Sequence, residues 1–134
     1  MQIFTRSRHN IENGHLPGPC VLISISDPGS RPVMIKDIVN VKALLRLEFH
    51  DIEEPMPGYV PFDRLHIDAL RAMIEISGIW DYNTLPIIVQ CEAGVSRSAA
   101  IAIWLSREFH EDDKLFWMPP CQPNRWMLEM LGVN

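Results

Sequence analysis

Residues 86–105 read PIIVQCEAGVSRSAAIAIWL, and this order indicates a buried strand, a tight loop and a buried helix. Residues 86–90 are short and aliphatic, which is typical of a strand covered on both faces. Residues 96–109 are apolar nearly all round, as expected of a helix packed against a sheet. We therefore expect the loop at 91–97 to join the carboxyl end of a strand to the amino end of a helix.

Other segments repeat this alternation of strand and helix. Residues 20–26 and 43–49 are short, aliphatic and bounded by turn formers, and residues 1–5 could add an edge strand. A helix is predicted from Pro61 to Gly78, and a short last helix at 125–131. The apolar face predicted for the first of these helices consists of Phe62, Leu65, Ala69, Leu70, Met73 and Ile74.

Strands that alternate with helices favour an α/β fold with a central, mostly parallel sheet of four to five strands flanked by helices. In such sheets, sites form where the carboxyl ends of the strands meet. Three loops should then share one edge of the sheet, namely 27–32, 50–60 and 91–97. At 134 residues the chain is expected to form one domain, residues 1–134.

The composition excludes several classes of protein. With a net charge of -5 and scattered arginines, the chain lacks the basic field that nucleic acids or anionic membranes require. No apolar run is long enough to cross a bilayer, and no signal peptide is evident. Three cysteines in such a chain favour reduced thiols over a disulfide framework. We expect a cytoplasmic protein, and no membrane or nucleic-acid partner.

The loop at 91–97 has the features of an anion site. Successive backbone N–H groups of a tight loop that enters a helix can turn inward, and the helix dipole adds to their field. Gly94 supplies the backbone freedom for such a curl, and Arg97 can hold two phosphate oxygens with its planar fork. The same field favours the thiolate of Cys91, a strong nucleophile, while the hydroxyl of Ser98 could stabilise that thiolate as it departs.

Residues 91–98, Cys-Glu-Ala-Gly-Val-Ser-Arg-Ser, resemble the signature loop of the protein tyrosine phosphatase superfamily. The likeness is greatest to the dual-specificity branch and its small bacterial relatives, and Asn124-Arg125-Trp126 resembles a second segment of predicted bacterial tyrosine-phosphatase-like proteins. At one position the sequence departs from the pattern, because Gln90 stands where such loops usually have a histidine.

The resemblance implies a phosphotyrosine protein phosphatase-like fold and the hydrolysis of phosphomonoesters through a phosphocysteine intermediate, without a metal or other cofactor. The residues implied to bind the substrate phosphate are Glu92, Ala93, Gly94, Val95, Ser96 and Arg97.

Such a reaction needs a proton donor for the leaving oxygen. The candidates are Asp51, Glu53, Glu54, Asp63 and Asp68. Asp51 follows the strand at 43–49 and opens a loop rich in Pro and Gly, where the family is expected to carry a movable acid, so Asp51 is the predicted general acid. Asp63 is the reserve.

The expected substrate is a phosphorylated protein or an aryl phosphate, since Glu92 would repel a multiply phosphorylated ring. Arg125 is expected either to reach the phosphate or to pack with the last helix. A different class of function stays open, namely a phosphatase-like module that binds a phosphorylated partner without hydrolysing it.

Overall fold

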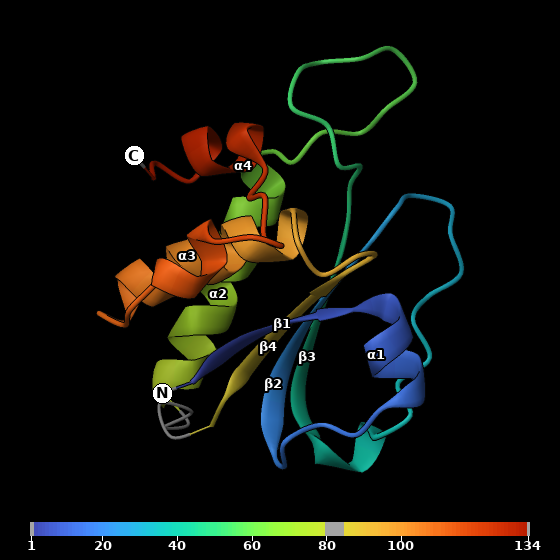
Figure 1. Cartoon of the computed structure of the whole chain (residues 1–134), viewed down its shortest axis with the longest axis vertical. Coiled ribbons are helices and arrows are strands. Elements are labelled where there is room, and N and C mark those ends of the chain that lie inside the picture. Colours follow the sequence, from blue (N-terminus) through green and yellow to red (C-terminus); the bar gives the residue numbers. More distant parts are fainter. Residues whose placement is uncertain (1, 80–84, 134) are drawn as a thin grey trace.

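Four parallel strands form the centre of the fold in the computed structural model, which describes residues 2–79 and 85–133 (Figure 1). In sheet order β1-β4-β2-β3, they are β1 Ile3–Ser7, β4 Ile87–Cys91, β2 Cys20–Ser26 and β3 Val41–Glu48. All of the pairings are parallel. The predicted strands are thus confirmed, including the edge strand at the amino end, although Met1 lies outside the described residues.

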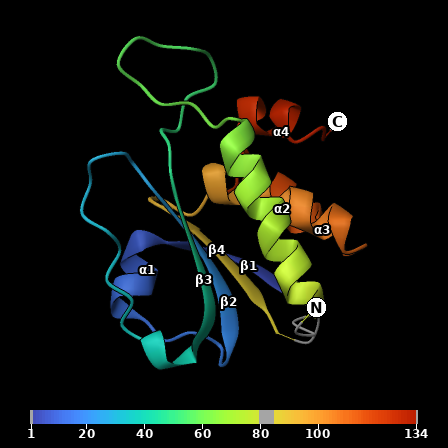
Figure 2. The same cartoon turned by 180° about the vertical axis from the view of Figure 1, so that it is seen from behind.

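Helices cover both faces of this sheet (Figures 1 and 2). α2 (Arg64–Ile79) and α3 (Arg97–Glu108) lie on one face, and α1 (Arg8–Asn13) lies on the other. α4 (Arg125–Met130) packs against α3, and the short 3-10 helices η1 (Ile38–Asn40) and η3 (Lys114–Trp117) complete the described elements.

The central strands contribute side chains to two cores. Val21, Ile23 and Val89 belong to the larger core with α2 and α3, whereas Leu22 and Ile88 belong to a smaller core with α1. Successive side chains of a strand point to opposite faces, so a strand covered on both faces must be apolar throughout. This is why the near-continuous aliphatic runs in the sequence predicted buried strands correctly.

The predicted apolar face of α2 needs one correction. The helix begins at Arg64 rather than Pro61, and Leu65 is 76% exposed. At 3.6 residues per turn, Leu65 lies about 200° away from Ile67 and so points to the opposite side of the helix. Ile67 packs against the core together with Leu70.

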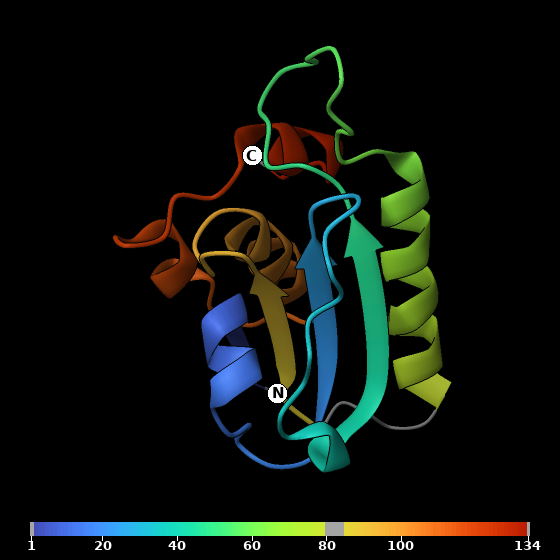
Figure 3. The same ribbon diagram turned by 90° about the vertical axis from the view of Figure 1, so that its right-hand side faces the viewer.

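The carboxyl ends of the strands gather at one edge of the sheet, and the loops that follow β2, β3 and β4 leave from it (Figure 3). Phe49 directly follows β3 and its backbone N–H donates to the carbonyl of Ser26 at 3.2 Å, which ties two of these loops together. The predicted meeting of three loops at this edge is therefore confirmed.

Candidate active site

Cys91 ends β4 and is only 2% exposed. Its thiol donates to the hydroxyl oxygen of Ser98 at 3.2 Å, and the sulfur accepts from the backbone N–H of Gly94 at 3.3 Å. Both contacts would stabilise negative charge on sulfur, because a hydroxyl can turn its proton toward a thiolate and the amide already points at it. The residues from Cys91 to Arg97 are called the cradle loop below.

The cradle loop offers several backbone donors. Within the described residues, the N–H groups of Ala93, Val95 and Ser96 have no hydrogen-bond partner, and α3 begins immediately after them. Unpaired amides at the positive end of a helix dipole form a site for an anion.

Gly94 permits the curl of this loop. Its φ is +77°, and a Cβ at this position would lie 2.7 Å from the backbone of Arg6 and Ser7 at the end of β1. A side chain would thus meet both backbone strain and a fixed obstacle.

Two hydrogen bonds from one nitrogen, Nη1, fix the guanidinium of Arg97. Nη1 donates to the Oδ1 of Asp27 and to the carbonyl oxygen of Phe49, both at 2.7 Å. Nε is buried and has no partner in the described part of the chain. An unsatisfied donor of this kind costs free energy unless something binds it, and an oxyanion in the cradle would supply the missing acceptor.

Asp27 was not among the predicted site residues. Its carboxylate follows β2 and fixes the guanidinium of a residue 70 positions later. Sequence reasoning placed its loop at the correct edge but had no signal for the ion pair itself.

Gln90 faces away from the thiol, because it precedes Cys91 on the same strand. Its side chain is fully buried, its Oε1 accepts a hydrogen bond from the hydroxyl of Ser24, and its Nε2 donates to the carbonyl of Ile25 at 3.4 Å. These hydrogen bonds join β4 to β2. Gln90, which stands where the resembling loops usually have a histidine, therefore stabilises the sheet.

Asp51 touches the cradle loop. Its Oδ1 accepts hydrogen bonds from the Ser96 hydroxyl at 2.9 Å and from the Nδ2 of Asn124 at 2.7 Å. The loop that carries it, residues 50–60, is called the acid loop below. Among the described residues, no other candidate acid makes a hydrogen bond to the cradle loop.

Two of the alternative acids are engaged elsewhere. Glu53 accepts from the backbone N–H of Arg125 at 2.7 Å. Asp63 accepts from the N–H of Leu65 at 2.9 Å and lies 3.1 Å from His66, which places it at the start of α2. Geometry therefore favours Asp51 over the reserve acid.

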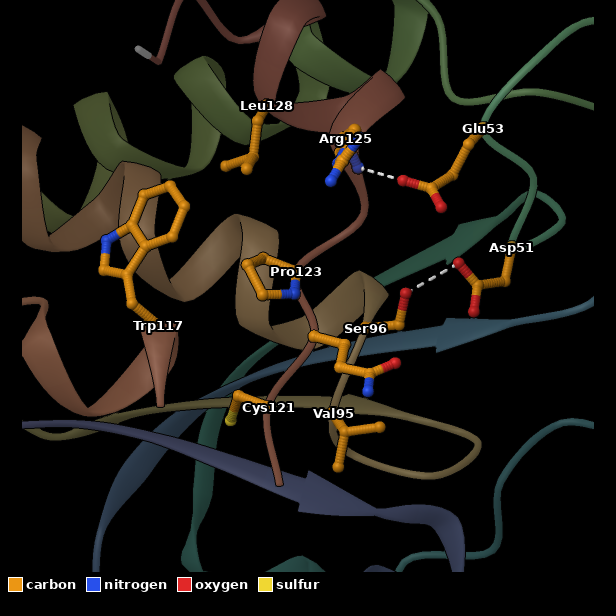
Figure 4. Close-up of a pocket in the computed structure, with 10 residues that line it drawn as sticks. Asp51, Glu53, Val95, Ser96, Trp117, Cys121, Pro123, Arg125 and Leu128 are labelled. Atoms are coloured by element: carbon orange, nitrogen blue, oxygen red, sulfur yellow. Dashed lines mark hydrogen bonds between the residues drawn. The ribbon is translucent and has the colours of Figure 1, made fainter. Parts of the chain in front are cut away.

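A pocket of about 690 Å³ adjoins the outer wall of the cradle loop (Figure 4). Asp51 and Ser96 stand at one end of it and Trp117 at the other, while Arg125 and Leu128 lie along its α4 side. The guanidinium of Arg125 is exposed and forms no ion pair within the described residues. The pocket does not include Cys91 or Arg97, so it is a hollow beside the cradle rather than the cradle itself.

Cys121 also lines this pocket. Burial raises the pKa of its thiol, and negative charge on Cys91 raises that pKa further. Cys121 is therefore held as a neutral thiol.

Within residues 2–79 and 85–133, no three His, Cys, Asp or Glu side chains come together in a way that could hold a metal ion. In the same part of the chain, no helix has the length and apolar character needed to span a bilayer.

Comparisons with known proteins bear on the fold. No family model and no curated protein matches the sequence. Solved structures do match, among them human DUSP28, with a TM-score of 0.59 and 18% identity, covering 97% of this chain and 88% of that one. A human tyrosine phosphatase-like serine/threonine/tyrosine-interacting protein matches with a TM-score of 0.65, 17% identity and the same coverages.

The PTP-2 phosphatase of Cydia pomonella matches with a TM-score of 0.60 and 20% identity, covering 98% of this chain and 84% of that one. Identities this low establish likeness of fold, and the narrower resemblance to small bacterial proteins stays a prediction. The chain therefore shares its fold with these phosphatase and phosphatase-like structures.

Proposed function

We propose that residues 1–134 act as one cysteine-dependent phosphatase domain that hydrolyses phosphomonoesters, in the manner of a protein tyrosine or dual-specificity phosphatase. One observation carries the proposal. A single seven-residue loop holds the sulfur of Cys91, three backbone amides and the buried Nε of Arg97, and within the described residues these four N–H groups have no partner. Such a loop can bind a phosphoryl group and present a nucleophile to it.

In the first step, the thiolate of Cys91 attacks phosphorus, and the bond from phosphorus to the ester oxygen breaks. Asp51 gives its proton to that oxygen, so the leaving group departs as a neutral alcohol or phenol. Arg97 and the loop amides hold the remaining phosphoryl oxygens, and a phosphocysteine results.

In the second step, Asp51, now ionised, takes a proton from a water molecule as that water attacks the phosphocysteine. The sulfur–phosphorus bond breaks, inorganic phosphate forms, and Cys91 returns to the thiolate. The first step needs a thiolate and a protonated acid together. We therefore expect a bell-shaped pH profile with a mildly acidic optimum.

The proposed substrate is a phosphorylated protein or an aryl phosphate. The pocket beside Asp51 supports a leaving group larger than a phenol, since its volume of about 690 Å³ falls within the range of sites for whole ligands. The three cysteines are free, which agrees with a nucleophile kept reduced, and a cytoplasmic setting is part of the proposal.

The test is turnover of para-nitrophenyl phosphate from acidic to neutral pH, with and without vanadate. Cys91→Ser should lower kcat at least about 10³-fold, because a nucleophile cannot be replaced by its neighbours. Cys20→Ala is the matched control, since it removes a buried thiol at the amino end of β2, away from the cradle loop. Full turnover in Cys91→Ser would contradict the proposed mechanism.

A second function is favoured by one comparison, because one structure with this fold is described as a phosphatase-like interacting protein. In that case the cradle loop would bind a phosphorylated partner and release it unchanged. The same assay separates the two functions: no turnover by the unmodified protein, together with saturable binding of vanadate, would favour the binding module.

A further inference from the structure

Asn124 joins three parts of the site although it is only 1% exposed. Its Nδ2 donates to the Oδ1 of Asp51 at 2.7 Å and to the carbonyl of Ile52 at 3.1 Å. Its Oδ1 accepts from the N–H of Met127 at 3.0 Å, which makes Asn124 the N-cap of α4. Every hydrogen-bonding atom of the side chain therefore has a partner.

The backbone of Asn124 contacts the cradle loop as well. Its N–H donates to the carbonyl of Ser96 at 3.3 Å. Two residues earlier, the backbone N–H of Gln122 donates to the carbonyl of Val95 at 2.8 Å. The amide side chain that reaches Asp51 is thus fixed to the same loop that would hold the phosphate, so the distance between acid and phosphate depends on Asn124.

We propose that Asn124 is the positioning residue of the general acid, an inference that rests on the proposed function. The Oδ1 of Asp51 already accepts two hydrogen bonds, from Asn124 and from Ser96. An oxygen that accepts two donors is a poor place for a proton, so the transferable proton resides on Oδ2. Asn124 thereby sets both the place of the carboxyl group and the oxygen that donates the proton.

The chemistry of the amide suits this task. Nδ2 donates and cannot accept, so it can bond to Oδ1 whether Asp51 is protonated or ionised, and it bonds more strongly to the ionised form. The acid can then give up its proton in the first step and regain one in the second while its position is kept. A carboxylate at residue 124 would lack the donor and would repel the ionised Asp51.

Two variants separate this role from the capping of α4. Asn124→Ser and Asn124→Asp both retain an oxygen that can cap the helix, and both lose the donor to Asp51. Their turnover is measured with phenyl phosphate, whose leaving group needs a proton, and with 2,4-dinitrophenyl phosphate, whose leaving group departs without one. Phenyl phosphate turnover should fall about tenfold or more, and dinitrophenyl phosphate turnover by about twofold or less.

The pH profile gives a second readout that capping alone would not move. Loss of a donor to the ionised carboxylate disfavours ionisation, and a facing carboxylate disfavours it further. The alkaline limb for phenyl phosphate should therefore move to higher pH, with the larger movement in Asn124→Asp.

Asn40→Ser is the matched control, because Asn40 also donates from Nδ2 to a carboxylate, that of Asp37, at 2.9 Å. This pair lies near the start of β3, at the opposite end of that strand from the acid loop. The control should leave the ratio of the two turnover rates unchanged.

Equal losses on both esters, or no loss on either, would overturn the positioning role while leaving the proposed function intact. No turnover of either ester by the unmodified protein would overturn the proposed function, and this inference with it.

Discussion

The cradle loop and the acid loop leave the same edge of the sheet, yet they are held in different ways. The cradle loop is fixed along its length, because the end of β1 passes beneath Gly94, and Arg97 is tied to Asp27. The acid loop stands out from the body (Figures 1 and 3). Met56 and Tyr59 in it are 43% and 49% exposed.

Contacts fix the acid loop mainly at its ends. At its neck, the N–H of His50 donates to the carbonyl of Val60 at 2.7 Å, and the N–H of Val60 donates to the Nδ1 of His50 at 2.8 Å. Near its start, Asn124 holds Asp51. The proposed phosphate site is thus preorganised by the sheet, whereas the proposed acid depends on two side chains, Ser96 of the cradle loop and Asn124 at the start of α4.

The difference predicts that the largest effect comes from Arg97→Lys. Lysine keeps the positive charge but lacks the planar fork that binds two phosphoryl oxygens while holding Asp27. We expect kcat for para-nitrophenyl phosphate to fall about 10³-fold. Arg107→Lys, at the other end of the same helix, is the control and should change kcat by less than about twofold. A loss below about tenfold for Arg97→Lys would show that the fork does not bind the transferred group.

A smaller effect is expected for Asp51→Asn. Turnover of phenyl phosphate should fall about 10²-fold and lose its alkaline limb, since the proton donor is gone while the cradle remains. Asp63→Asn is the matched control, because Asp63 caps the start of α2 and should leave the profile unchanged. If Asp63→Asn removed the alkaline limb and Asp51→Asn did not, Asp63 rather than Asp51 of the acid loop would be the proton donor.

The contrast between the two loops also shows how far the sequence could lead. The cradle loop is contiguous, so the thiol, the glycine and the arginine could be recognised together at 91–97. The groups that hold it are distant, because Asp27 and Arg97 are 70 positions apart and Asp51 and Asn124 are 73 apart. A single sequence gives the distance along the chain but not which loops meet.

Asn124 did leave a local signal, since an asparagine before a short helix is a favoured N-cap. That signal predicts the capping contact with Met127 but not the second one with Asp51, which requires α4 to pack against the acid loop. The missed helix α1 has a similar cause. It has six mostly polar residues, and only Ile11 among them is buried, so no apolar periodicity marks it.

The last prediction compares one glycine from each loop. Gly94 and Gly58 have similar φ values, +77° and +84°, so alanine at either position adds similar backbone strain. A Cβ at Gly58 would meet nothing within 4 Å, whereas one at Gly94 would lie 2.7 Å from backbone atoms that cannot move aside. Gly58→Ala should therefore lower the free energy of unfolding by about 1 kcal/mol, and Gly94→Ala by about 3 kcal/mol.

Urea denaturation of both variants measures this difference directly. Gly58→Ala should also keep its turnover of para-nitrophenyl phosphate within about twofold, because the tip of the acid loop is far less constrained than the cradle. Equal losses of stability in the two variants would mean that β1 does not support the cradle loop. The cradle loop would then be no more rigidly held than the acid loop, which contradicts the proposed difference between them.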